Sequence, residues 1–160
     1  MSPEYRALMQ RHLPDPTVFH SGEAALMPAL MEWLISSGRV RSRTSVVHEV
    51  PWLGRRVDLA LLNGRGLTTA FELKIGRLQR AIEQAAYNRE SFHRSWVVTG
   101  NRPKSEGLDW VRELGIGLLV VQGDVVSTFV TPVIREPHPA VVRRLRTTIE
   151  TRAGIADAAV

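Results

Sequence analysis

Two acidic residues and a lysine in the middle of the chain have the types and spacing of a hydrolytic site. Asp58 lies in the apolar run VDLA (57–60), and Glu72 and Lys74 lie in the run AFELK (70–74). If both runs are strands, Glu72 and Lys74 point to one face, because side chains alternate across a strand. Pairing of the two strands would then bring both carboxylates to one end of a sheet.

Two carboxylates and a neighbouring backbone carbonyl make an all-oxygen site of the kind that suits Mg²⁺, for which Mn²⁺ can substitute. A cation there would polarise a phosphodiester and lower the pKa of a bound water. An ammonium group on the same face, that of Lys74, can hydrogen-bond this water or stabilise charge on the phosphate. The pattern therefore predicts metal-dependent phosphodiester hydrolysis.

Lysine is rare in this chain, which makes the position of Lys74 informative. Of the 21 Lys and Arg residues only two are lysines, Lys74 and Lys104, so chance alone puts a lysine at a given basic position about once in ten. Arginine stays protonated at essentially all pH values, whereas the pKa of a lysine shifts readily in a site. A chain that otherwise uses arginine has a lysine where proton chemistry needs one.

The same pattern has a simpler interpretation, because it is short and its residues are common. Glu72 and Lys74 would then form a solvent-facing ion pair on an edge strand, and Asp58 would cap a strand entrance. The apolar surroundings of both acids, and their positions on consecutive strands, favour a site instead.

The elements that must position these residues are three strands, expected at 44–50, 56–62 and 67–74. A turn over 51–55 joins the first two, and Asn63-Gly64 is typical of a hairpin between the second and the third. Further strands are expected at 95–99, 116–122 and 125–130, and helices at 22–37, 77–93, 105–114 and 139–152. This order predicts an α/β fold with a mixed central sheet flanked by helices.

Some helix ends have specific signals. Ser21 is a good N-cap for the helix at 22–37, and Pro28 requires that this helix be kinked or begin late. Gly38 is expected just past its end. Residues 1–20 read as a short helix or an irregular arm that ends in a turn at Asp15-Pro16.

Asp58 and Glu72-Leu73-Lys74 resemble the active-site signature of the PD-(D/E)XK nuclease superfamily, also called restriction-endonuclease-like. The order α-β-β-β-α-β over about residues 21–100 is similar to the common core of that superfamily. The resemblance implies that Asp58 and Glu72 bind the metal, that Leu73 contributes its backbone carbonyl, and that Lys74 assists the attacking water. Val57 stands in place of the proline of the family name, which many members lack.

Three more residues are weighed as members of the site. Many members of the superfamily carry an acid on the first helix, where Glu23 is the best match; its alternative role is that of an acid favoured by the helix dipole. Gln84, on the helix after the signature, occupies a place where some relatives have a glutamine, although its spacing to Tyr87 is one residue shorter than in exonuclease-like members. Glu49 on the first strand is a weaker candidate.

Composition limits the other possibilities. The chain has 160 residues, a formal net charge of +5 and no cysteine, so any metal must be held without thiolates. No apolar stretch approaches the roughly 18 residues needed to cross a bilayer, and no signal-peptide pattern is present. We expect a cytoplasmic protein with one domain over 1–160: a core at about 21–130, an arm at 1–20, and a C-terminal helix and tail at 136–160.

The basic balance favours nucleic acid, specifically DNA, as partner. Several arginines lie close in sequence to the three expected strands at 44–74, and they would either line a track for phosphate groups or lie on a solvated surface. They are Arg39, Arg41, Arg43, Arg55, Arg56, Arg77 and Arg80. Trp52 would either stack on bases or pack in its turn. Target choice would come from a homodimer partner or another subunit.

These observations favour a Mg²⁺-dependent DNA endonuclease. The alternatives are a nuclease-fold protein that binds nucleic acid or a protein partner without cutting, and an unrelated α/β interaction domain.

Overall fold

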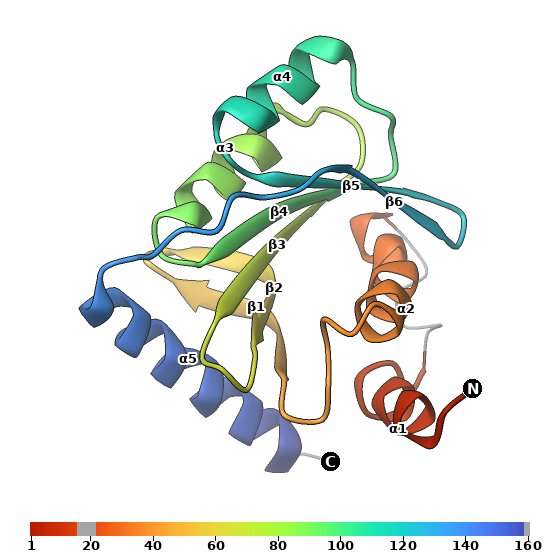
Figure 1. Ribbon diagram of the computed structural model, residues 1–160, viewed down its shortest axis with the longest axis vertical. Helices are drawn as coiled ribbons and strands as arrows, with labels where there is room; N and C mark the ends of the chain where they lie inside the picture. Colours follow the sequence, from red (N-terminus) through yellow and green to blue (C-terminus); the bar gives the residue numbers. More distant parts are fainter. Residues whose placement is uncertain (16–21, 159–160) are drawn as a thin grey trace.

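A mixed six-stranded sheet in the order β1 to β6 organises the protein (Figure 1). The computed structural model describes residues 1–15 and 22–158. The strands are β1 (Ser45–Trp52), β2 (Arg55–Leu62), β3 (Thr68–Lys74), β4 (Arg94–Thr99), β5 (Gly117–Gln122) and β6 (Val125–Val130). Strands β3, β4 and β5 are parallel, and the other neighbours pair antiparallel. The predicted α/β class with a mixed, helix-flanked sheet is confirmed.

Helices cover both faces of the sheet (Figure 1). They are α1 (Pro3–His12), the short 3₁₀ helix η2 (Gly22–Leu26), α2 (Met27–Ser36), α3 (Gln79–Arg89), α4 (Ser105–Glu113) and α5 (Pro139–Ala158). Helices α1 and α2 share an apolar core with one face of the sheet, which includes Leu59, Phe71 and Trp96. On the other face, α5 packs on β1 and β2, α3 on β3 and β4, and α4 on β5 and β6. No helix in the described ranges is long and apolar enough to cross a bilayer.

The N-terminal elements resolve two of the open expectations. The arm contains a true helix, α1, whose first turn is closed by a hydrogen bond from the Tyr5 amide to Ser2 Oγ at 3.1 Å. The next helix begins late and is not kinked, because the short helix η2 precedes it and Pro28 lies in the first turn of α2. Backbone amides in the first turn of a helix have no partner within the helix, so the missing N–H of Pro28 costs no hydrogen bond. Gly38 follows α2 with φ +76°, as a residue past a helix end requires. The expected cap at Ser21 and turn residue Pro16 lie outside the described residues.

Three predicted boundaries are wrong. The first hairpin turn is not 51–55 but only Leu53 and Gly54, both with positive φ, so Pro51 lies in β1 opposite Arg56. A two-residue turn of this kind follows the twist of the strands. Helix α3 spans Gln79–Arg89 and not 77–93, and α5 runs six residues beyond its predicted end at 152.

The β2–β3 hairpin sets the register that matters for function. Its loop is closed by Asn63, whose Oδ1 accepts hydrogen bonds from the amides of Arg65 and Leu67, both at 2.9 Å. The ladder pairs Ala60 with Ala70 and Leu59 with Phe71. One step further along the same register, Asp58 faces Glu72.

Candidate active site

Asp58 and Glu72 lie side by side at the end of the β2–β3 ladder. Their carboxyl groups are close enough for the charge of Asp58 to raise the pKa of Glu72, and the Leu73 amide donates to Asp58 Oδ2 at 2.8 Å. The ladder pairs end at Leu59 and Phe71, so the side chain of Asp58 takes the place of a strand partner for the Leu73 amide. Glu72 is only 3% exposed. The hairpin therefore places the half-buried carboxyl group of Asp58 beside the buried carboxyl group of Glu72.

Burial of this pair changes its protonation. Burial is the largest cause that raises the pKa of Glu72 to about 8, and the adjacent Asp58 charge raises it further. The pKa of Asp58 is also raised by burial, but the hydrogen bond from Leu73 favours its ionised form. With a pKa of about 8, Glu72 is protonated at neutral pH, because burial and the adjacent Asp58 charge both disfavour its ionised form.

Asn88 is a site residue that the sequence analysis missed. It lies on α3, buried, and its Nδ2 donates to Glu72 Oε1 at 2.8 Å. The signal was present, because Asn88 is four residues after Gln84 and such residues share a helix face. Its bond fixes the Glu72 carboxyl group from the helix side.

Lys74 is at the mouth of the same site, paired with Glu23. The distance from Lys74 Nζ to Glu23 Oε1 is 3.1 Å, and both side chains are partly exposed. Glu23 reaches the end of β3 from η2, so an element far away in the sequence supplies this partner. The pair does not match the alternative interpretation of the motif, in which Lys74 binds Glu72 on an edge strand: Glu72 is buried, and β3 lies between β2 and β4.

A small cavity of about 230 Å³, here called the carboxylate cavity, brings the predicted residues together. Its lining consists of Glu23, Arg56, Asp58, Glu72, Leu73, Lys74, Arg80, Ala81 and Gln84. All six predicted site residues are in this set. Glu49 is not: its carboxylate is 3.9 Å from Arg56 Nη1, on the exposed side of the hairpin, although its charge also raises the pKa of Asp58.

The carboxylate cavity offers few side chains that could bind a metal ion. Within residues 1–15 and 22–158, no group of three or more His, Cys, Asp or Glu side chains is arranged to hold a metal ion. The two carboxylates nevertheless fit Mg²⁺, which is usually bound through one or two carboxylates together with water and substrate phosphates. A divalent cation would also offset the burial and the neighbouring Asp58 charge, which together raise the pKa of Glu72.

Trp52 does not reach solvent as a base-stacking side chain would. It is 8% exposed and packs in the core beneath α5, so the interpretation as a packed residue is confirmed, although Trp52 ends β1 and does not lie in the turn. The exposed aromatic ring near the site is Tyr87 on α3, which has the guanidinium of Arg55 3.5 Å above its ring centroid.

Comparisons with known proteins support the fold alone. No protein-family model matches the chain, and no curated protein matches it. A solved structure, the SPO1766 protein of unknown function from Silicibacter pomeroyi, is similar with a TM-score of 0.56 and 22% identity. The match covers 71% of this chain and 77% of that one. At this identity the similarity concerns the arrangement of helices and strands and carries no activity with it.

Proposed function

We propose that this protein is a Mg²⁺-dependent nuclease that hydrolyses DNA phosphodiester bonds. The observation that carries the proposal is the close approach of the buried carboxyl group of Glu72 and the half-buried carboxyl group of Asp58, in a cavity that also contains Lys74. Burying two acids against each other costs stability, since each must leave water beside a like charge. Such an arrangement is typical of a site whose acids act together.

Asp58 and Glu72 would hold the cation, with the backbone carbonyl of Leu73 beside them. A bound divalent ion supplies charge for a phosphate oxygen and a water of lowered pKa. The chain's own part is to hold the ligands: the Leu73 amide orients Asp58, and Asn88 orients Glu72. Partners of this kind fix the geometry of metal ligands.

The rest of the cavity suits an anionic substrate. Arg56 and Arg80 line it beside the carboxylates, and their guanidinium groups match the geometry of phosphate oxygens. Lys74, held by Glu23, is close enough to the cavity to donate a hydrogen bond to a phosphate oxygen or to the attacking water. Gln84 adds an amide that can orient either group.

The resemblance of Asp58 and Glu72-Leu73-Lys74 to the PD-(D/E)XK superfamily supports the same proposal. We assign the chain to that superfamily as part of it, with hydrolysis that leaves a 5′-phosphate. The observed order of η2 and α2, the β1–β3 meander, α3 and β4 is compatible with this assignment.

The direct test is cleavage of linear, circular and branched DNA by the purified protein with Mg²⁺ or Mn²⁺. The Asp58→Asn variant keeps the size of the side chain and should be inactive. The matched control is Asp124→Asn, which changes an exposed residue in the β5–β6 turn and should cut like wild type. Absence of cleavage above the Asp58→Asn background on every substrate would contradict the proposal.

A second candidate is a protein of the same fold that binds nucleic acid without cutting it. The observation that favours it is the pairing of Lys74 with Glu23, which occupies the ammonium group that hydrolysis would use. Titration calorimetry separates the two: a binding module shows salt-dependent DNA affinity with no need for a divalent ion.

A further inference from the structure

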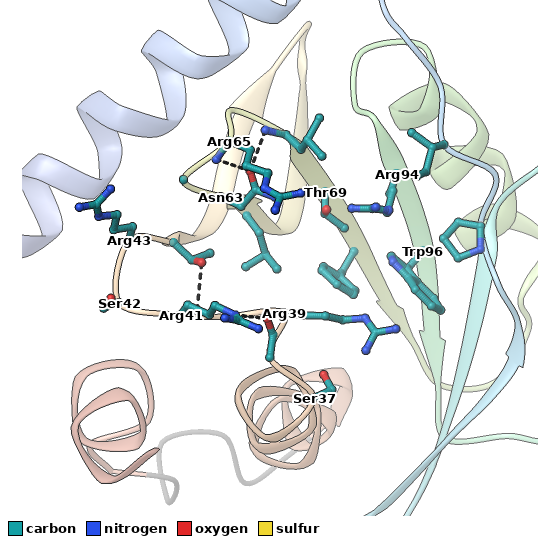
Figure 2. A pocket seen from close by; sticks show the side chains of 18 of the residues that line it. Ser37, Arg39, Arg41, Ser42, Arg43, Asn63, Arg65, Thr69, Arg94 and Trp96 are labelled. Carbon is teal, nitrogen blue, oxygen red and sulfur yellow. Dashed lines mark hydrogen bonds between the residues drawn. The ribbon is translucent and has the colours of Figure 1, made fainter. Parts of the chain in front are cut away.

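A second cavity, of about 940 Å³, lies on the opposite face of the sheet (Figure 2). Its sheet floor includes Leu61, Thr69 and Phe71, whose side chains point away from the face that carries Asp58 and Glu72. It lies toward the start of β3, whereas the carboxylate cavity is at the end of that strand. No residue lines both cavities.

Five arginines from three separate segments line this second cavity, here called the arginine groove. They are Arg39, Arg41 and Arg43 between α2 and β1, Arg65 in the β2–β3 loop, and Arg94 at the start of β4. The lining contains a single acidic residue, Glu4. Within the described ranges, none of the five arginines forms an ion pair with a carboxylate. The groove therefore gathers positive charge that the protein itself leaves unbalanced.

The arginines are spread along the groove rather than aimed at one point. Figure 2 shows Arg43 at one side and the side chains of Arg39 and Arg94 at the other, with Arg41 and Arg65 between them. Some are held in place: Arg41 Nε donates to the Gly38 carbonyl at 3.1 Å, and the Arg39 guanidinium lies 4.3 Å from the centroid of the Trp33 ring. A series of guanidinium groups spread along a groove is suited to an extended anion with repeated charges.

Two arginines of the groove, Arg39 and Arg94, are close enough to repel each other. Burial, followed by the charge of Arg94, lowers the pKa of Arg39. A guanidinium group nevertheless stays protonated near neutral pH, so the repulsion cannot be relieved by losing a proton. Counterions from solvent or a bound anion must relieve it instead.

We propose that the arginine groove binds the phosphate backbone of a nucleic acid strand, as a second contact separate from the carboxylate cavity. The choice of nucleic acid over other polyanions rests on the proposed function, but the binding does not depend on cleavage. The spread of the arginines and the volume of the groove favour several consecutive phosphates over one small phosphorylated molecule. The groove would hold DNA on the face opposite the proposed site of cutting.

The test measures binding of a short fluorescein-labelled DNA oligonucleotide by anisotropy over a range of salt concentrations, without divalent ions. All variants are made in the Asp58→Asn background, so that no cleavage occurs. The groove variant is Arg43→Gln/Arg65→Gln, which changes two exposed side chains. The matched control, Lys104→Gln/Arg112→Gln, removes the same charge from exposed positions on and next to α4 that line neither cavity.

We expect the groove variant to bind about ten-fold more weakly or worse, with a salt slope shallower by about two units, because each lost phosphate contact removes about 0.9. The control should stay within about two-fold of its parent, as expected if general charge contributes little. A second groove variant, Arg39→Gln/Arg94→Gln, should reproduce the loss. Thermal melting of each variant confirms that it is folded. Equal weakening by groove and control variants would overturn the inference.

Two further results separate this inference from the proposed function. If wild-type protein cuts no DNA but needs the groove arginines to bind it, the nuclease proposal fails and the proposal that the arginine groove binds DNA is supported. If wild-type protein cuts DNA, and the same groove substitutions made without Asp58→Asn leave both binding and cutting at the wild-type level, the groove proposal fails alone. Binding of a nucleoside triphosphate, but not of the oligonucleotide, through these arginines would also overturn it, in favour of a small-molecule site.

Discussion

The carboxylate cavity and the arginine groove each bring like charges together, on opposite faces of one sheet. In the cavity, Asp58 and Glu72 are in contact, and Leu73 and Asn88 supply hydrogen bonds. In the groove, five arginines line one cavity with no carboxylate partner among the described residues. The two regions differ in how the repulsion can be relieved.

A carboxyl pair can relieve its repulsion by keeping one proton, and the raised pKa of Glu72 shows this. A guanidinium cluster cannot, because arginine does not deprotonate near neutral pH. The cavity is therefore stable without a ligand but responds to pH, whereas the groove depends on counterions and responds to salt. Each of the following predictions tests one side of this difference.

The largest expected effect is that of Glu72→Gln. The amide removes a charge that a cation would need, so DNA cleavage should fall by at least about 100-fold. The stability of the folded protein should instead rise at high pH. The glutamine stays neutral there, whereas the ionised glutamate of wild type is unfavourable in a buried position beside Asp58. Cleavage rates and thermal melting at alkaline pH, both against wild type, measure the two effects. The control Glu113→Gln removes an exposed acid from α4 and should alter neither.

Lys74→Arg should have the next largest effect, a fall in cleavage on the order of ten-fold. The positive charge and the pairing with Glu23 can persist, but arginine cannot give up a proton and its head group is larger. The matched control is Lys104→Arg at the only other lysine in the chain, which is exposed and outside both cavities. Cleavage by Lys74→Arg at the wild-type rate would exclude a proton-handling role for Lys74.

The sequence was sufficient to predict this site because its information is local. Asp58, Glu72 and Lys74 lie on two strands joined by one short loop, so alternation and hairpin pairing bring them together. Asn88 was missed because its role depends on how α3 packs on the sheet. The Glu23–Lys74 pair likewise needs η2 to reach the end of β3, which no local pattern specifies.

The arginine groove could not be predicted from the sequence for the same reason. Arg39, Arg41 and Arg43 flank the first three strands in the sequence, as Arg56 and Arg80 do, so the sequence leaves open whether they line one phosphate track or lie on a solvated surface. In the structure the first three line the groove and the other two line the carboxylate cavity, on opposite faces of the sheet. Which face a loop residue reaches is set by the path of the chain after α2, and strand periodicity does not extend into such a loop.

The pH dependence of stability should distinguish the cavity from the groove. The pKa of Glu72 is about 8 in the folded protein against a usual value of 4.5. Between these values the folded state holds a proton that the unfolded chain releases, so this group lowers stability as pH rises through the window. Metal-free wild type should therefore lose thermal stability relative to Glu72→Gln from about pH 4.5 to about pH 8.

Mg²⁺ should reverse this loss, and more strongly at the upper end of the window. A ligand that binds only the folded state stabilises it by mass action, and the proton on Glu72 competes less as pH rises. Each kcal/mol gained corresponds to about 2–4 °C in melting temperature for a protein of this size class. Melting curves with EDTA and with excess Mg²⁺ measure the effect. A Mg²⁺ shift of equal size in wild type and Glu72→Gln would place the ion elsewhere.

The smallest expected effect concerns Arg94. Removing its charge by Arg94→Gln relieves the repulsion with Arg39, so the melting temperature at low salt should rise slightly, by the equivalent of about 0.5 kcal/mol or less. Added salt should abolish the difference, because counterions screen the repulsion in wild type. Added DNA should reverse its sign, since wild type gains more from a bound polyanion than the variant does. A stability gain in Arg94→Gln that persists in saturating DNA would mean that the anion does not bind between these arginines. Only the carboxylate cavity would then remain as a proposed ligand site.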